Sequence, residues 1–132
     1  MELKIATEKA RVPVTVVHVD GDIDSGSYEA FLAGVEQAID AGARYILIDL
    51  SNVPFVSSSG LRAFNIIFNR LRQLTPDMPD DQMRKGINAG TYHSPHLKLL
   101  NPSKAAETTL ESSGFSMFIQ SFSDTQKALA AF

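Results

Sequence analysis

The hydrophobic and polar positions of the chain alternate between two periodicities, which predicts strands and helices in turn. Residues 12–19 are rich in valine and end at Asp20-Gly21, so they are predicted to form a strand closed by a turn. Pro13 places the start of that strand at an edge or an entry point of the sheet. Residues 3–6 form a weaker candidate strand. The continuous apolar run at 45–48 is typical of a strand buried on both faces.

Two longer segments have the helical spacing of apolar positions. The first helix is predicted to begin near Ser27, with its hydroxyl accepting hydrogen bonds from the first turn, and to end at Gly42. The second is predicted to follow 57–60 and to end at Thr75-Pro76, with Ile66 off its apolar stripe. The residues expected to be buried along the two helices are Tyr28, Phe31, Leu32, Val35, Ala38, Ile39, and then Leu61, Phe64, Ile67, Phe68, Leu71 and Leu74.

The rest of the chain completes an alternation of strands and helices. Residues 75–92 are proline-rich and polar without apolar periodicity, so a long inserted loop is expected there. Further strands are expected at 96–100 and 117–120, and further helices at 103–112 and 124–132. This order predicts one α/β domain over 1–132, with four helices on a central mixed, mostly parallel sheet of about five strands.

Composition narrows the classes of function. The 132 residues include no cysteine, which excludes a disulfide framework, a cysteine nucleophile and a thiolate zinc site. The net charge of −3 provides no electrostatic footprint for direct nucleic-acid binding. Neither a secretory signal nor an apolar run long enough to span a membrane is present, so a cytoplasmic protein is expected. The acidity is uneven: residues 1–60 hold nine acidic and four basic side chains, against six and eight in 61–132.

Part of this acidity lies in one turn, where three aspartates occupy alternate positions from Asp20 to Asp24. A calcium loop is excluded because its sixth position is Ser25 rather than glycine and its twelfth is Phe31 rather than glutamate. The turn also resembles the aspartate pair of haloacid-dehalogenase phosphatases, but that family needs a larger fold with a lid. A solvated acidic turn is the simplest interpretation.

The sequence Ser57-Ser58-Ser59-Gly60 lies at a predicted strand-to-helix junction and allows three interpretations. One serine caps the helix and the others are turn residues. Alternatively, Ser58 is the nucleophile of a hydrolase elbow, although Val56 stands where that motif has its first glycine. In the third interpretation Ser58 is phosphorylated, because a helix N-terminus stabilises a phosphate. A hydrolase would also need a histidine as its base. The chain has three histidines, His18, His93 and His96, and their positions in the sequence do not favour that role.

Several segments together resemble the STAS domain family, in particular its bacterial anti-sigma-factor antagonists. Residues 21–24, 46–50 and 53–61 are similar to the family's second-strand turn, third strand and the start of its second helix. Residues 103–115 and 126–129 are similar to its later helices. The resemblance covers the chain apart from 75–92, which looks like an insertion.

The resemblance implies a non-enzymatic signalling protein without a cofactor or metal. Such a protein binds an anti-sigma factor serine kinase and so releases a sigma factor, and binding is lost when the serine equivalent to Ser58 is phosphorylated. A cognate phosphatase reverses the switch, and the chain is expected to be a monomer or a weak dimer. Ser57 stands where the family has an aspartate. The expected partner-binding residues are Asp22, Asp24, Ser57, Ser59, Gly60, Arg62 and Ile66. The alternative function is a non-catalytic STAS scaffold in a stress-signalling or lipid-transport complex.

Overall fold

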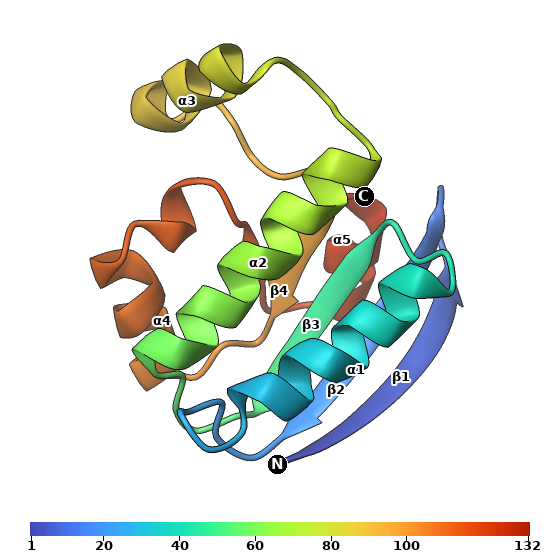
Figure 1. Ribbon diagram of the computed structural model, residues 1–132, viewed down its shortest axis with the longest axis vertical. Coiled ribbons are helices and arrows are strands. Elements are labelled where there is room, and N and C mark those ends of the chain that lie inside the picture. The colour runs from blue at the N-terminus through green and yellow to red at the C-terminus, as the bar shows by residue number, and fades with distance from the viewer.

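Five strands form one mixed sheet in the order β1-β2-β3-β4-β5 (Figure 1). The computed structural model describes residues 1–132. β1 runs antiparallel to β2, and every other neighbouring pair is parallel, which confirms the predicted mixed and mostly parallel sheet. The strands are β1 (Glu2–Lys9), β2 (Pro13–Asp20), β3 (Ile46–Asn52), β4 (Leu97–Leu100) and β5 (Ser121–Phe122).

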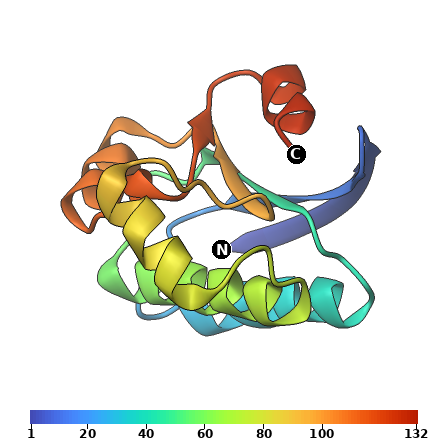
Figure 2. The same ribbon diagram turned by 90° about the horizontal axis from the view of Figure 1, so that it is seen from above.

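Helices lie on both faces of this sheet (Figure 2). The larger core, of 22 buried residues, joins the sheet to α1, α2 and α4, and a smaller core of six lies under α5. No helix is both long and apolar enough to cross a membrane. The helices are α1 (Tyr28–Asp40), α2 (Ser58–Leu74), α3 (Asp80–Ala89), α4 (Lys104–Ser112) and α5 (Thr125–Ala130).

The helix count differs from the prediction, because the segment 75–92 is not simply a loop. It contains α3, which ends at Gly90 with a left-handed φ of 75°. No residue of α3 is fully buried, but Met83 and Ile87, one turn apart, pack against the large core. Two apolar positions in a polar segment are too few to produce a visible helical period, which is why the prediction missed this helix.

Several element boundaries also differ from those expected. β1 is twice as long as the predicted 3–6, because each of its eight residues pairs with β2. The last strand falls at Ser121–Phe122 rather than 117–120, since a 3₁₀ turn at Phe115–Met117 occupies that region. Leu74 was expected in the buried stripe of α2 but is 44% exposed at the end of that helix.

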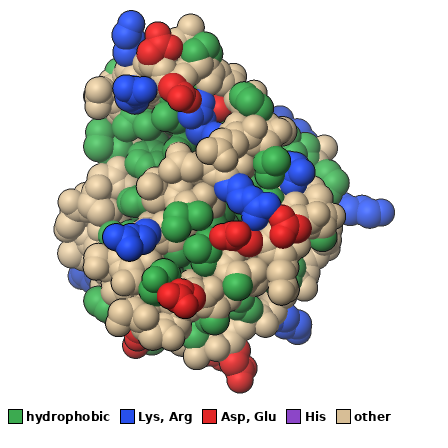
Figure 3. All heavy atoms as spheres, viewed as in Figure 1, with side chains coloured by type: hydrophobic (Ala, Val, Ile, Leu, Met, Phe, Trp, Pro, Cys, Tyr) green, Lys and Arg blue, Asp and Glu red, His purple; other side chains and the backbone are tan.

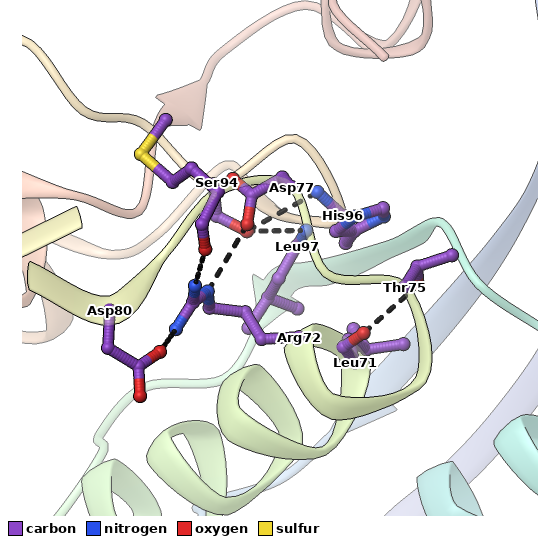
Figure 4. Close-up of polar contacts among 9 residues, drawn as sticks. Leu71, Arg72, Thr75, Asp77, Asp80, Ser94, His96 and Leu97 are labelled. Atoms are coloured by element: carbon purple, nitrogen blue, oxygen red, sulfur yellow. Dashed lines mark hydrogen bonds and ion pairs between the residues drawn. The ribbon is translucent and has the colours of Figure 1, made fainter. Parts of the chain in front are cut away.

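One arginine attaches the inserted segment to the end of α2 (Figure 4). The guanidinium of Arg72 uses all three nitrogens. Nε lies 3.2 Å from Asp77 Oδ1, Nη1 lies 2.8 Å from Asp80 Oδ1, and Nη2 donates to the carbonyl of Met78 at 2.7 Å. The Arg72 side chain is only 10% exposed, and its three contacts fall within four consecutive residues. Arg72 therefore fixes residues 77–80 and with them the start of α3.

Replacing this side chain should release α3 locally without unfolding the domain. We expect Arg72→Ala to remove about 2 kcal/mol of local stability, since hydrogen bonds to charged groups contribute about 1.5–3 kcal/mol. Amide hydrogen exchange across 80–89 should then become roughly 30-fold faster, while exchange in β3 is unchanged. Arg84→Ala is the matched control, because Arg84 is exposed on α3 itself and forms no ion pair. Unchanged exchange in α3 of Arg72→Ala would contradict the anchoring role.

A buried histidine lies beneath the same segment. His96 is 6% exposed, its ring packs 5.2 Å from the ring of Tyr45, and its Nδ1 has no hydrogen-bond partner. Burial lowers the pKa of His96, although the nearby carboxylate of Asp77 acts in the opposite direction. The folded protein therefore holds this imidazole neutral at neutral pH.

This histidine should make the protein less stable in mild acid. Its folded pKa lies below the unfolded value near 6.5, so the unfolded chain takes up the proton first as the pH falls. The contribution of the neutral His96 imidazole to stability is complete above the unfolded pKa, and it is lost as the pH falls through the folded pKa. We expect His96→Phe, which keeps an aromatic ring against Tyr45, to lose less stability than the wild type between pH 7.5 and pH 5. Urea denaturation at several pH values measures this, and parallel curves for the two proteins would rule it out.

Candidate functional site

The loop after β2 and the loop after β3 lie side by side at one end of the sheet (Figure 1). Ile23 and Val56 form an isolated parallel bridge between them. The N–H of Ile23 donates to the carbonyl of Phe55 at 3.0 Å, and the N–H of Ser57 donates to the carbonyl of Ile23 at 2.9 Å. The acidic turn and the serine run, distant in sequence, are therefore neighbours.

A glycine lets the first turn of α2 pack closely on this bridge. Gly60 is buried, and a Cβ added to it would lie 2.8 Å from the carbonyl oxygen of Ile23 and 2.8 Å from Val56 Cγ1. Of the residues expected to contact a partner, Gly60 is thus inaccessible from outside. Its contribution is to hold the two loops together.

The three serines before Gly60 occupy different environments. Ser57 is the N-cap of α2, and its Oγ accepts a hydrogen bond from the N–H of Gly60 at 3.3 Å. Ser58 is the first residue of the helix, is exposed, and its side chain makes no hydrogen bond. Ser59 is half-buried. Ser58 therefore has the one freely accessible hydroxyl at the N-terminus of α2.

A hydrolase would require a base hydrogen-bonded to its serine nucleophile. None of the three histidines is hydrogen-bonded to Ser58. His18 Nδ1 instead lies 2.7 Å from Asp49 Oδ2 on the sheet. Although burial opposes it, hydrogen bonds from the side chain and backbone of Ser51, and then from His18, hold the pKa of Asp49 below its usual value. The elbow interpretation thus lacks a base next to its serine.

Hydrogen bonds within the acidic turn place Asp22 and Asp24 in different environments. Asp24 Oδ1 accepts from the N–H of Gly26 at 2.9 Å, and Ser27 Oγ donates to the carbonyl of Asp22 at 2.7 Å. Ser27 was expected to cap α1, but its Oγ accepts from the N–H of Asp24 at 3.0 Å and makes no capping bond. Asp24 is consequently a half-buried loop residue, whereas the Asp22 side chain is exposed and unpaired.

Exposed side chains form a row along α2 that begins at Ser58. Arg62 and Ile66 follow Ser58 at intervals of four residues, which puts all three on one face of the helix. Ile66 is 38% exposed, so it points away from the core as predicted. Figure 3 shows this face of the molecule, where hydrophobic side chains are interspersed with charged ones.

Sequence reasoning missed one residue of this surface. Phe55 is 46% exposed on the loop that leads into α2, while its neighbour Val56 is fully buried. Alternation of inward and outward side chains along an extended segment is the signal that would have identified it. Aromatic residues, phenylalanine included, are enriched in protein–protein interfaces relative to the rest of the surface. We name the exposed residues Asp22, Phe55, Ser58, Arg62 and Ile66 together the docking face, as the candidate surface for a partner.

Comparisons with known proteins match this part of the chain. A family model described as the STAS domain matches residues 5–76, which include the acidic turn, the serine run and all of α2. No curated protein matches the chain at a significant level.

Solved structures share the fold at low sequence identity. An anti-sigma factor antagonist from Mycobacterium paratuberculosis is 18% identical, with a TM-score of 0.68 and coverage of 98% of this chain and 93% of that one. The anti-sigma factor antagonist SpoIIAA in its unphosphorylated form is 18% identical, with a TM-score of 0.65 and coverage of 94% and 92%. The Bacillus cell fate determinant SpoIIAA in its phosphorylated form is 17% identical, with a TM-score of 0.62 and coverage of 96% of each chain.

Proposed function

Because the chain belongs to the STAS domain family, we propose that it is an anti-sigma factor antagonist switched by phosphorylation of Ser58. The unphosphorylated protein binds an anti-sigma factor serine kinase through the docking face and so frees a sigma factor. The observation that carries the proposal is the exposed, unbonded hydroxyl of Ser58 at the N-terminus of α2, beside the Asp22 turn. The solved structures of SpoIIAA, which has both an unphosphorylated and a phosphorylated form, support it.

A phosphate on Ser58 needs no refolding to be accommodated. The first turn of α2 has backbone N–H groups without a helical partner, and the helix dipole favours negative charge there. Ser57, in place of the family aspartate, keeps a capping oxygen but adds no competing charge at that point. The exposed carboxylate of Asp22 opposes the added phosphate across the loop. The free protein therefore tolerates phosphorylation, and the effect is exerted on the bound partner.

The docking face also defines the chemistry of its partner. Phe55 and Ile66 are exposed apolar groups that favour an apolar pocket. Arg62 is exposed and free of ion pairs, so a carboxylate on the partner would satisfy it. A carboxylate placed near Arg62 is also placed to repel a phosphate one turn away on Ser58. Attraction in one state and repulsion in the other then arise from the same partner group.

The remaining properties follow from this proposal. The protein acts in the cytoplasm as a binding protein rather than an enzyme, and it needs no cofactor. A cognate phosphatase returns Ser58 to its hydroxyl form. Direct contact with nucleic acid is not involved, in keeping with the net charge of −3. A monomer or weak dimer leaves the docking face free.

The test is affinity capture from the native cell with mass spectrometry of bound proteins. Immobilised wild type and Ser58→Ala should enrich a serine kinase, and Ser58→Asp should not. Thr125→Asp is the matched control, because it adds the same charge to the first turn of α5 on the opposite face of the sheet and should still capture the kinase. Capture of the same proteins by all four baits would refute the switch. Recovery of large STAS assemblies without a kinase would instead support a scaffold.

A further inference from the structure

The sheet ends at β5, a strand of two residues that pairs only with β4. The N–H of Leu99 donates to the carbonyl of Gln120 at 2.9 Å, and the N–H of Asn101 donates to the carbonyl of Phe122 at 2.7 Å. Backbone groups of successive residues in a strand point to opposite sides, so the N–H and C=O of Ser121 point away from β4. One donor and one acceptor are therefore free at this edge.

A groove lies along this free edge, between α4 and residues 116–123. It consists of two adjoining hollows, of about 280 and about 250 Å³, which share Glu107, Ser121 and Phe122 as lining residues. Leu110 and Ile119 line the larger hollow but are only 3% and 2% exposed, so the accessible apolar lining comes from Phe122, which is half-buried. The groove thus combines an apolar surface with an unpaired strand edge.

The charged side chains that line the groove are all acidic. Glu107 and Glu111 are exposed on α4, four residues apart, and both line the larger hollow. No lysine or arginine lines either hollow. Neither glutamate forms an ion pair within the protein, so both carboxylates are free for a ligand.

We propose that this groove binds an extended basic peptide segment of a partner protein, which joins the sheet as an additional strand beside β5. Main-chain hydrogen bonds to Ser121 hold the peptide, as in other cases of strand addition. Its side chains alternate in direction, so lysine or arginine on one side faces Glu107 and Glu111, while apolar residues on the other side contact the half-buried ring of Phe122. The inference does not depend on phosphorylation of Ser58, because the groove and the docking face share no residue.

The experiment uses the full chain and a defined probe, an acetylated and amidated heptapeptide of alternating lysine and valine. Titration at low salt, followed by ¹H–¹⁵N NMR, should shift the amides of 120–123 and of α4 with a Kd on the order of 100 µM. The same peptide with glutamate in place of lysine should leave the spectrum unchanged. A peptide N-methylated on the residues facing β5 should bind at least tenfold more weakly, because it cannot donate to the strand edge.

Two variants separate the charge contribution from the backbone contribution. Glu107→Gln combined with Glu111→Gln should weaken the lysine peptide about fivefold to tenfold, and this difference should shrink at high salt. The control is Glu8→Gln combined with Glu29→Gln, which makes the same change of net charge at exposed sites elsewhere. Equal binding of the lysine and glutamate peptides, shifts outside the groove, or undiminished binding of the N-methylated peptide would overturn the proposal.

Discussion

Phosphorylation of Ser58 is expected to weaken binding of the anti-sigma factor kinase by a factor on the order of a thousand. A phosphoserine carries about −1.5 to −2 charges at neutral pH. A unit-charge pair about 7 Å apart costs roughly 2 kcal/mol at an effective dielectric constant near 20. Two such pairs, between the phosphate and carboxylates of the partner, amount to about 4 kcal/mol and hence to the thousandfold change.

Calorimetric titration of the captured kinase with phosphorylated and unphosphorylated protein measures this ratio. Because the docking face is exposed, the ratio should fall as the ionic strength rises. Ser58→Asp, with a single charge, should show a smaller loss than the phosphoprotein, and Ser58→Ala should bind as the wild type does. Thr125→Asp again controls for net charge. A ratio near one at low salt would show that Ser58 is not at the interface.

Gly60→Val should destabilise the whole domain by about 3 kcal/mol, the upper part of the usual range for overpacking. The new Cβ would lie 2.8 Å from the carbonyl oxygen of Ile23, a backbone atom that cannot rotate away. That carbonyl also accepts the hydrogen bond from Ser57, so any shift that relieves the contact breaks the link between the two loops. The start of α2 would then separate from the acidic turn.

Thermal unfolding checks this prediction, with a drop in Tm of roughly 10 °C expected for a domain of this size. Gly26→Ala is the matched control from the same pair of loops. A Cβ there would meet only Asp24 Oδ1, at the ordinary contact distance of 3.5 Å, so Tm should change little. A Gly60→Val protein with the wild-type Tm would contradict the close packing of the helix on the bridge.

The central part of the fold could be predicted because its signals are local and strong. The valine-rich run of β2 and the apolar run that becomes β3 leave little alternative to buried parallel strands. Once both are placed side by side, the loops that follow them must meet at the same end of the sheet. The proximity of the acidic turn to Ser58 follows from this topology.

Features that depend on tertiary contacts were not predictable in the same way. α3 has only Met83 and Ile87 on its inner side and is anchored by Arg72, whose partners are identifiable only in three dimensions. Ser27 has the sequence position of a helix cap, but an acidic turn folded beneath it offers its hydroxyl a competing set of partners. In both cases the deciding interaction joins residues that no simple periodicity relates.

Transfer of phosphate to Ser58 by the partner kinase shows whether this protein is a phosphorylation switch. The purified chain is incubated with the captured kinase and ATP, and phosphorylated peptides are mapped by mass spectrometry. We expect stoichiometric phosphate on Ser58 in the wild type and none in Ser58→Ala, with Ser57 and Ser59 unmodified in both. Full phosphorylation of Ser58→Ala, or a wild type that the bound kinase leaves unmodified, would contradict it.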